Sequence, residues 1–196
     1  MNIPDDMVEH VGKIFAGEYE CDWVKGAPII LDIGANVGGF AVWASYRWPH
    51  AQLHCYEPVL SNYDLLLENT KAFVDRVDCY NVGVGEPGLR DIYYGKHNRG
   101  ECSLYKGAEQ RDAGEQVQII DPQHLPESHL VKIDTEGAEI EILEGMTYLP
   151  FAYVIEYHSD ANRRTIDRLL HDYTLMEMQS TSPNYGIVKY VRTDLL

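Results

Sequence analysis

The stretch IILDIGANVGG at residues 29–39 decides the fold of this chain. Its first five residues are apolar apart from Asp32, which predicts a buried strand over 29–33. A glycine-rich turn follows at 34–39, and a helix that begins at its end must stop near Pro49, because proline cannot continue the helical hydrogen bonds. A strand, a glycine turn and a helix in this order are typical of the first unit of a cofactor-binding α/β sheet.

Further alternation of apolar runs and amphipathic stretches predicts a doubly wound α/β sheet. After the first unit we expect strands at 52–57, 77–84, 129–134, 151–157, 174–179 and 187–191, and helices at 61–73, 136–145 and 159–173. The first of these helices opens with a capping-box pattern, Ser61 to Asp64. The last two strands flank a turn with proline and glycine at 183–186, which favours antiparallel pairing.

The segment between the third and fourth strands is too long for a plain crossover and must carry structure of its own. Residues 92–94 and 117–120 are expected to form extra β segments there. We therefore expect a single domain, 1–196, with an N-terminal helical cap over about 1–27 and an inserted β-containing segment over about 86–126.

Composition disfavours several classes of function. With 196 residues, 45% of them hydrophobic, the chain suits one core. Sixteen Lys and Arg against thirty-one Asp and Glu leave a net charge of −15, which disfavours nucleic acid and anionic membranes as partners. The sequence has no apolar run of membrane-spanning length and no signal-peptide pattern at its start, so we expect a soluble, cytoplasmic protein. Four scattered cysteines without a C-x-x-C pair are expected to be reduced.

The glycine turn favours one cofactor over another. Asn36 stands where a dinucleotide fingerprint needs a second glycine, and its side chain would crowd a pyrophosphate. S-adenosylmethionine has no phosphate, and its ammonium and sulfonium suit an acid such as Asp32 nearby. Glu57, at the end of the second strand, can accept hydrogen bonds from both ribose hydroxyls. The alternative is that Gly34 and Gly38 only serve a tight turn and Glu57 is a solvated strand end.

Two motifs resemble the FkbM-type S-adenosylmethionine-dependent methyltransferases: LDIGANVG at 31–38 and VKIDTEGAEIEILEG at 131–145. The segments FAGEYE at 15–20, Glu57-Pro58 and CSL at 102–104 agree with the same family. The resemblance implies a class I methyltransferase (Rossmann-like) sheet of seven strands, order 3-2-1-4-5-7-6, with the last strand antiparallel. It also implies methyl transfer to a hydroxyl oxygen.

The expected cofactor site combines the glycine turn with the ends of the following strands. Its members are Asp32, Gly34, Ala35, Asn36, Gly38, Glu57, Pro58, Asn81, Val82 and Asp134.

Methyl transfer from a sulfonium is an in-line displacement, so the protein must align the acceptor and manage its proton. Asp134, which ends the fourth strand, and Glu136 are candidates for either task, or they only complement a helix dipole. His158, at the end of the fifth strand, is the first choice of general base, because imidazole titrates near neutrality; the alternative is a loop or core histidine. The three together could bind a divalent ion, but we expect no metal.

Polar residues elsewhere are candidates for acceptor binding. Lys132 interrupts an apolar strand and needs a charged partner, for which Glu156 on the neighbouring strand is the candidate; this pair either organises the acceptor site or is purely structural. Ser103 is a further possible polar contact. Basic residues and tyrosines in the insertion either recognise an anionic or sugar-bearing acceptor or form a solvated loop. They are Lys96, His97, Arg99, Lys106 and Arg111, with Tyr93, Tyr94 and Tyr105.

The sequence therefore predicts an O-methyltransferase of a small molecule or glycan. An N-methyltransferase is the second enzyme hypothesis, although no Asn-Pro-Pro-aromatic run follows the fourth strand. A module that binds the cofactor without catalysis is the third. The oligomeric state cannot be read from the residues.

Overall fold

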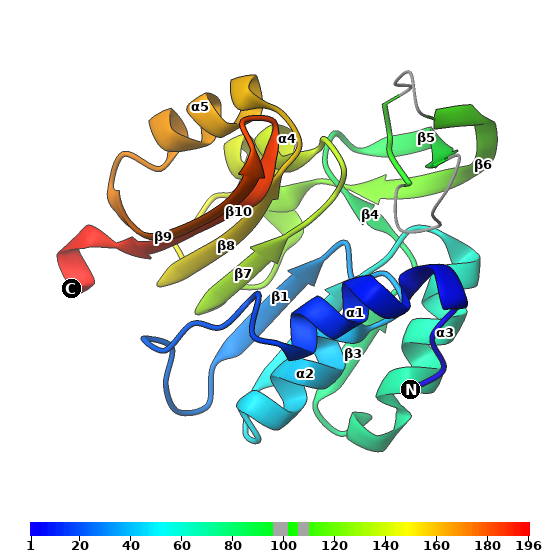
Figure 1. Ribbon diagram of the computed structural model, residues 1–196, viewed down its shortest axis with the longest axis horizontal. Helices are drawn as coiled ribbons and strands as arrows, with labels where there is room; N and C mark the ends of the chain where they lie inside the picture. The colour runs from blue at the N-terminus through cyan, green and yellow to red at the C-terminus, as the bar shows by residue number, and fades with distance from the viewer. Residues whose placement is uncertain (96–101, 106–109) are drawn as a thin grey trace.

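A seven-stranded sheet, mostly parallel, forms the centre of the protein in this computed structural model, which describes residues 1–95, 102–105 and 110–196 (Figure 1). Its strands are β1 (Ile29–Ile33), β2 (Gln52–Tyr56), β3 (Val77–Tyr80), β7 (Leu130–Ile133), β8 (Ala152–Tyr157), β9 (Tyr173–Ser182) and β10 (Tyr185–Arg192). They lie in the order β3-β2-β1-β7-β8-β10-β9, and β10 runs antiparallel to both of its neighbours. The doubly wound α/β sheet expected from the sequence is present.

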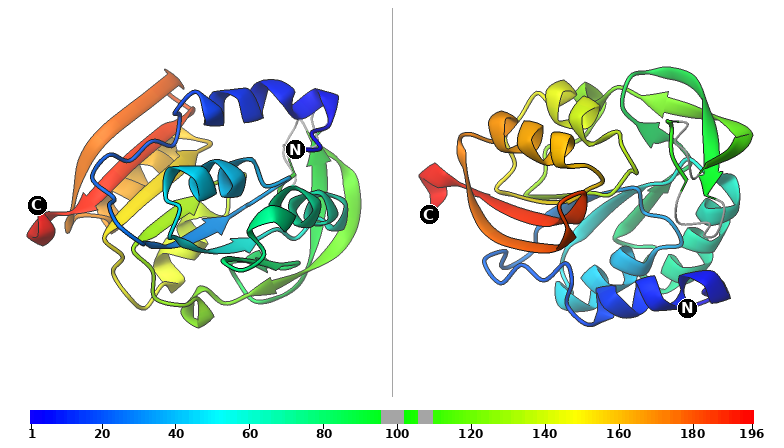
Figure 2. Two further views of the ribbon diagram at one scale, coloured as in Figure 1. Left: turned by 90° about the horizontal axis from the view of Figure 1, so that it is seen from below. Right: turned by 45° about the horizontal axis from the view of Figure 1, so that its top comes forward.

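Helices cover both faces of this sheet (Figure 2). They are α1 (Val8–Phe15), α2 (Gly39–Arg47), α3 (Leu60–Thr70), α4 (Glu139–Gly145) and α5 (Asp160–Leu169). Strand residues alternate between the two cores because successive side chains point to opposite faces. On β1, Ile30 packs with Phe40 of α2, whereas Leu31 packs in the core that contains Ile142 of α4 and Ile166 of α5.

The N-terminal helix α1 covers the glycine turn. Its apolar side chains recur at helical spacing, and Met7, Val11 and Val37 form one buried cluster. Gly39 at the start of α2 has no room for a bulky side chain, because an added Cβ would lie 3.0 Å from Ile14. The N-terminal segment, residues 1–15, therefore packs against the glycine turn and the start of α2, which follow β1.

The insertion forms a second, three-stranded sheet in the order β4-β6-β5. Its strands are β4 (Gly83–Val84), β5 (Gly88–Gly95) and β6 (Gln110–Ile120), so both expected β segments are present and longer than predicted. The single strand predicted at 77–84 is wrong: it divides into β3 and β4, which belong to different sheets. Asn81 lies at the division, where its side-chain amide donates to the carbonyls of Glu57 and Pro58.

Some expectations for the insertion cannot be compared with the structure. Lys96, His97, Arg99 and Lys106 lie outside the described residues. Tyr93 and Tyr94 lie on β5, and Arg111 lies on β6.

Two helices begin elsewhere than predicted. The predicted capping box at Ser61 is absent, because α3 begins at Leu60 with Val59 as its N-cap and no side-chain cap. The helix expected from Glu136 begins at Glu139, because Glu136 (φ 54°) and Gly137 (φ 125°) adopt left-handed backbone conformations. The residues between β7 and α4 are thus a turn, and this turn faces the site described below.

Among the described residues, no helix combines the length and apolarity that a membrane crossing requires. The four cysteines, all within the described ranges, form no disulfide.

Candidate functional site

A pocket opens at the carboxyl ends of β1, β2 and β7, where open α/β sheets bind ligands. Its empty volume, which includes the part open to solvent, is about 590 Å³. Apolar walls come from the large sheet and the insertion together. The lining includes the predicted residues Gly34, Asn36, Glu57, Pro58, Asp134 and Glu136, with Ile33, Val84, Ile92, Cys102 and Leu104 among its other members.

Gly34 shapes the floor of the pocket. Its φ of +81° is one that side chains disfavour, and an added Cβ would lie only 1.8 Å from the carbonyl oxygen of Asp134. The backbone after β1 therefore touches the backbone after β7. Gly38, also left-handed, has a different neighbour, because its Cβ would meet Leu66 of α3 at 2.9 Å. Gly38 thus allows α2 and α3 to pack and is not among the residues that line the pocket.

Glu57 is held rigidly at the side of the pocket. Its Oε2 accepts a hydrogen bond from the backbone N–H of Asn36 at 2.8 Å, and its Oε1 accepts one from Val59 at 2.9 Å. Burial raises the pKa of this carboxyl to about 7, although both backbone donors lower it. Each oxygen can accept a further hydrogen bond, so the geometry suits the role of ribose acceptor.

Asp32 and Lys132 form a buried ion pair below the glycine turn. Lys132 Nζ lies 3.0 Å from Asp32 Oδ1 and donates to the carbonyl of Gly34 at 2.6 Å. The predicted pairing of Lys132 with Glu156 is therefore wrong, because register places Lys132 opposite Asp32 on β1 and opposite Val154 on β8. Asp32 is fully buried, is not among the residues lining the pocket, and holds Lys132 with its carboxylate.

Other predicted cofactor residues support the pocket from outside. Asn81 holds the backbone that follows β2, and Val82 packs in the core on the α4 side. Ala35 lines a smaller cavity between α1 and the glycine turn, with an empty volume of about 280 Å³. The two cavities share Gly34, Asn36 and Asp134.

This smaller cavity brings in residues that the sequence did not indicate. Met7, His10 and Tyr19 line it from the N-terminal segment. Burial lowers the pKa of His10 below the ordinary histidine value. The sequence singled out only the FAGEYE segment, which contains Tyr19, and this pattern does not reveal which loop the segment will cover.

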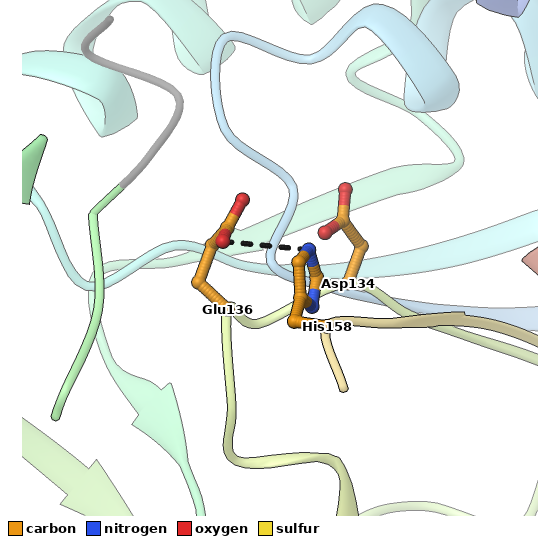
Figure 3. A group of neighbouring side chains, drawn as sticks. All are labelled: Asp134, Glu136 and His158. Atoms are coloured by element: carbon orange, nitrogen blue, oxygen red, sulfur yellow. Dashed lines mark ion pairs between the residues drawn. The ribbon is translucent and has the colours of Figure 1, made fainter. Parts of the chain in front are cut away.

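Asp134, Glu136 and His158 meet at the rim of the pocket (Figure 3). One side-chain ligand atom from each lies within 4.8 Å of the other two, and His158 Nε2 is 3.4 Å from Glu136 Oε2. They converge because β7 and β8 are adjacent parallel strands that end at the same edge of the sheet. The three residues chosen from the sequence as catalytic candidates are thus one cluster.

The surroundings of His158 do not suit a general base. Its Nδ1 lies 3.2 Å from Glu139 Oε1, and its Nε2 lies 3.6 Å from Glu156 Oε1. Burial alone would lower the pKa of this imidazole, but Glu136, Glu139 and Glu156 together raise it well above neutrality. These carboxylates favour the protonated imidazole over the neutral form that a general base requires, so the role predicted for His158 stays a prediction.

Glu156 is a buried anion that supports the cluster of Asp134, Glu136 and His158 from the protein interior. It accepts hydrogen bonds from the hydroxyls of Tyr19, at 2.8 Å, and Tyr185. Burial opposes its ionisation, but the charge of the nearby His158 and the hydrogen bonds from the tyrosines outweigh burial and lower its pKa to about 2. Asp134 differs, because burial and the charge of Glu156 raise the pKa of its carboxyl well above the ordinary value.

Ser103 connects the insertion to the turn after β7. Its hydroxyl donates to the carbonyl of Glu136 at 2.6 Å and accepts from the N–H of Tyr105 at 3.0 Å. In this structure its polar contacts therefore hold the backbone that carries Glu136.

Comparison with known proteins adds a family match and distant relatives. The model of the methyltransferase FkbM domain matches residues 32–181. A hexuronic acid methyltransferase, AglP of Haloferax volcanii, is 23% identical over 154 residues, covering 75% of this chain and 63% of that protein. Methyltransferase 1 of Beauveria bassiana is 22% identical, covering 60% of this chain and 57% of its own length. The chain thus spans about three fifths of the length of these two curated relatives.

Solved structures share the fold at low sequence identity. Precorrin-6y C5,15-methyltransferase of Geobacter metallireducens superposes with a TM-score of 0.54 at 14% identity, covering 94% of this chain and 88% of the other. TrmK of M. capricolum, solved with S-adenosylhomocysteine, has a TM-score of 0.54 at 11% identity, covering 94% and 68%. These likenesses show a class I methyltransferase fold.

Proposed function

Because the chain belongs to the FkbM methyltransferase family, a family of S-adenosylmethionine-dependent enzymes, we propose that it methylates a hydroxyl oxygen of a small molecule or glycan. In that reaction the acceptor oxygen attacks the methyl carbon, the carbon–sulfur bond breaks, and the hydroxyl proton must leave. The protein binds and aligns the two reactants and accepts the proton.

The position of Asp134 supports this proposal most directly. Its side chain belongs to the rim cluster, and the residue lines both cavities, so it stands where the two cavities meet. A carboxyl whose pKa is raised by burial holds a transferred proton better than an exposed aspartate does. We assign Asp134 as the group that accepts the hydroxyl proton.

His158 has a positioning role in this scheme. Its imidazolium lies between Glu136 and Glu156, so it fixes both carboxylates at the rim. Glu57 and Asn36 face the cofactor side, where the glycine turn ends. The curated relative named for hexuronic acid methylation supports a sugar as the acceptor class.

Methyl transfer and cofactor binding can be measured separately. Affinity for S-adenosylhomocysteine is measured by calorimetry, and transfer is measured with methyl-labelled S-adenosylmethionine and a panel of neutral sugars, uronic acids, phenols and amines. Asp134→Asn is expected to lower turnover by about 10²- to 10⁴-fold and to change the affinity for S-adenosylhomocysteine far less.

Asp172→Asn is the matched control, because it removes the same charge from an exposed residue outside the site. Its turnover should equal that of the unchanged protein. The proposal is wrong if the unchanged protein does not bind S-adenosylhomocysteine. It is also wrong if the products are methylated only on nitrogen.

A further inference from the structure

Negative charge is concentrated around one imidazole at the rim of the pocket. Asp134, Glu136, Glu139 and Glu156 surround His158, and the three glutamates are its ion-pair partners. The nearby Lys132 lies 3.0 Å from the fully buried Asp32 and 3.8 Å from Asp134, so one ammonium serves two carboxylates. Carboxylates therefore outnumber the cations available to balance them, a condition that favours a bound cation.

The orientation of His158 gives independent support. Glu139 is fully buried, and its Oε1 contacts Nδ1 of His158 at 3.2 Å. Glu139 is itself held by the N–H of Gly137 at 2.8 Å and the amide of Asn162 at 3.1 Å. A histidine that gives one ring N–H to a fixed carboxylate and turns its other nitrogen toward oxygen ligands has the arrangement of a metal ligand.

The other ring nitrogen lacks a hydrogen bond. Nε2 of His158 is buried and has no hydrogen-bond partner among the described residues, although two carboxylates lie within 3.6 Å. Figure 3 shows the imidazole between the carboxylates of Asp134 and Glu136. A buried nitrogen without a hydrogen bond, in such a setting, marks a place for a ligand.

We propose that Asp134, Glu136 and His158 bind a divalent cation of the Mg²⁺ or Mn²⁺ class. Two carboxylate oxygens and one imidazole nitrogen suit these ions, and no thiol belongs to the cluster. Adjacent ligands of an octahedral ion are about 3 Å apart, so the 3.4 Å between Nε2 and Glu136 Oε2 is close to what the ion needs. This reverses the expectation of a metal-free site.

The cation would also bind the acceptor. Three protein ligands leave about three positions of a six-coordinate ion for water or acceptor oxygens. A hydroxyl bound there lies at the rim of the cofactor pocket and loses its proton more readily. When the ion binds, the Nε2 proton passes to solvent, and the hydroxyl proton passes to the carboxylate of Asp134. This part of the inference rests on the proposed function, whereas binding of the ion does not.

Manganese binding can be measured directly on the full chain. After treatment with a chelator, the protein is titrated with Mn²⁺, and the free ion is followed by electron paramagnetic resonance. We expect about one Mn²⁺ per chain. Glu136→Gln and His158→Gln should each weaken binding at least tenfold, since even residues that only orient a ligand typically contribute tenfold or more.

Glu144→Gln is the matched control: it removes the same charge from an exposed residue on α4. It should bind Mn²⁺ as tightly as the unchanged protein. Affinity for S-adenosylhomocysteine, measured for every variant, checks that each one folds.

Three results would overturn the inference. The first is that the protein does not bind Mn²⁺ stoichiometrically. The second is that Glu144→Gln and Glu136→Gln weaken Mn²⁺ binding equally. The third concerns the acceptor-binding role and is methyl transfer at full rate in excess chelator. Specific Mn²⁺ binding in a protein that methylates no hydroxyl would support the cation site and count against the proposed function.

Discussion

At position 34 the backbone leaves no room for a side chain. An added Cβ would collide with the carbonyl oxygen of Asp134, at 1.8 Å. Gly34 therefore controls how closely the turns after β1 and β7 approach, and the residues of both turns depend on it.

Gly34→Ala is accordingly expected to destabilise the fold and abolish binding of S-adenosylhomocysteine. The control is Gly26→Ala, which has a similar φ of +77° but nothing within 4 Å of the added Cβ. The control should lose only the unfolding free energy that strain in the left-handed backbone costs, about 1–2 kcal/mol. Thermal unfolding and calorimetry measure both effects. Equal losses in the two variants would show that the contact with Asp134 is unimportant.

The ion pair of Lys132 and Asp32 predicts a large loss when only one partner is removed. Lys132→Met leaves Asp32 buried without its cation, which should cost about 3–5 kcal/mol of unfolding free energy. The double variant Lys132→Met, Asp32→Asn should be more stable than Lys132→Met alone, because the buried charge is gone. Urea unfolding measures both variants, and additive losses would contradict the pairing.

Glu57 predicts how cofactor affinity depends on pH. Its pKa in the free protein is about 7, raised chiefly by burial. Ribose hydroxyls donate to the ionised carboxylate, so below pH 7 binding must first expel a proton. From pH 8 to pH 6 the affinity for S-adenosylhomocysteine should fall roughly tenfold. Glu57→Gln should bind weakly at both pH values; an unchanged pH profile in this variant would assign the titration to another group.

Two helices, α5 and α3, differ in whether a serine side chain caps their first turn. At α5, the hydroxyl of Ser159 accepts a hydrogen bond from the N–H of Asn162 at 3.0 Å, an ordinary N-cap. At α3, Ser61 looked like a cap but lies inside the helix, since the carboxylate of Glu57 takes the N–H of Val59. The helix thus begins one residue before Ser61, and a local contact of Glu57 precedes its start.

This difference gives a paired prediction. Ser159→Ala should lower the unfolding free energy by about 1 kcal/mol, because the cap is lost. Ser61→Ala should change it by less than about 0.5 kcal/mol, as is usual for substitutions that remove no cap or core contact. Chemical denaturation measures both. A larger loss at Ser61 would indicate a capping role that the structure does not show.

In the whole molecule, the N-terminal helix closes the cofactor side of the site. Met7 and Val11 pack on Val37, and the smaller cavity lies beneath them. Contacts of this kind join the first residues of the chain to a turn more than twenty residues later. We infer that α1 contributes to cofactor affinity although it lies outside the region matched to the family, 32–181.

Removal of residues 1–15 is therefore expected to lower the melting temperature and to weaken S-adenosylhomocysteine binding at least tenfold. The physical reason is the loss of one wall of the smaller cavity and of a buried apolar cluster. Removal of the exposed residues 195–196 is the control and should change neither quantity. Unchanged affinity in the N-terminal deletion would exclude α1 from the site.

The residues by themselves determined the local units and the class of cofactor. Apolar runs and glycine turns are local patterns, so the first strand, the turn after it and the catalytic candidates after the later strands were readable in order. The strand at 77–84 and the helix from Glu136 were misjudged, because sheet membership and left-handed backbone depend on distant contacts.

Only the tertiary structure decided which charges meet. Parallel strands bring together residues far apart in the chain, and a change of register by one residue exchanges their neighbours. Register paired Lys132 with Asp32 and left Glu156 to the tyrosines and His158. The protonation of His158 follows from carboxylates supplied by a turn, a helix and a strand. Electrostatic energy depends on distance and burial, and both arise only when these elements pack together.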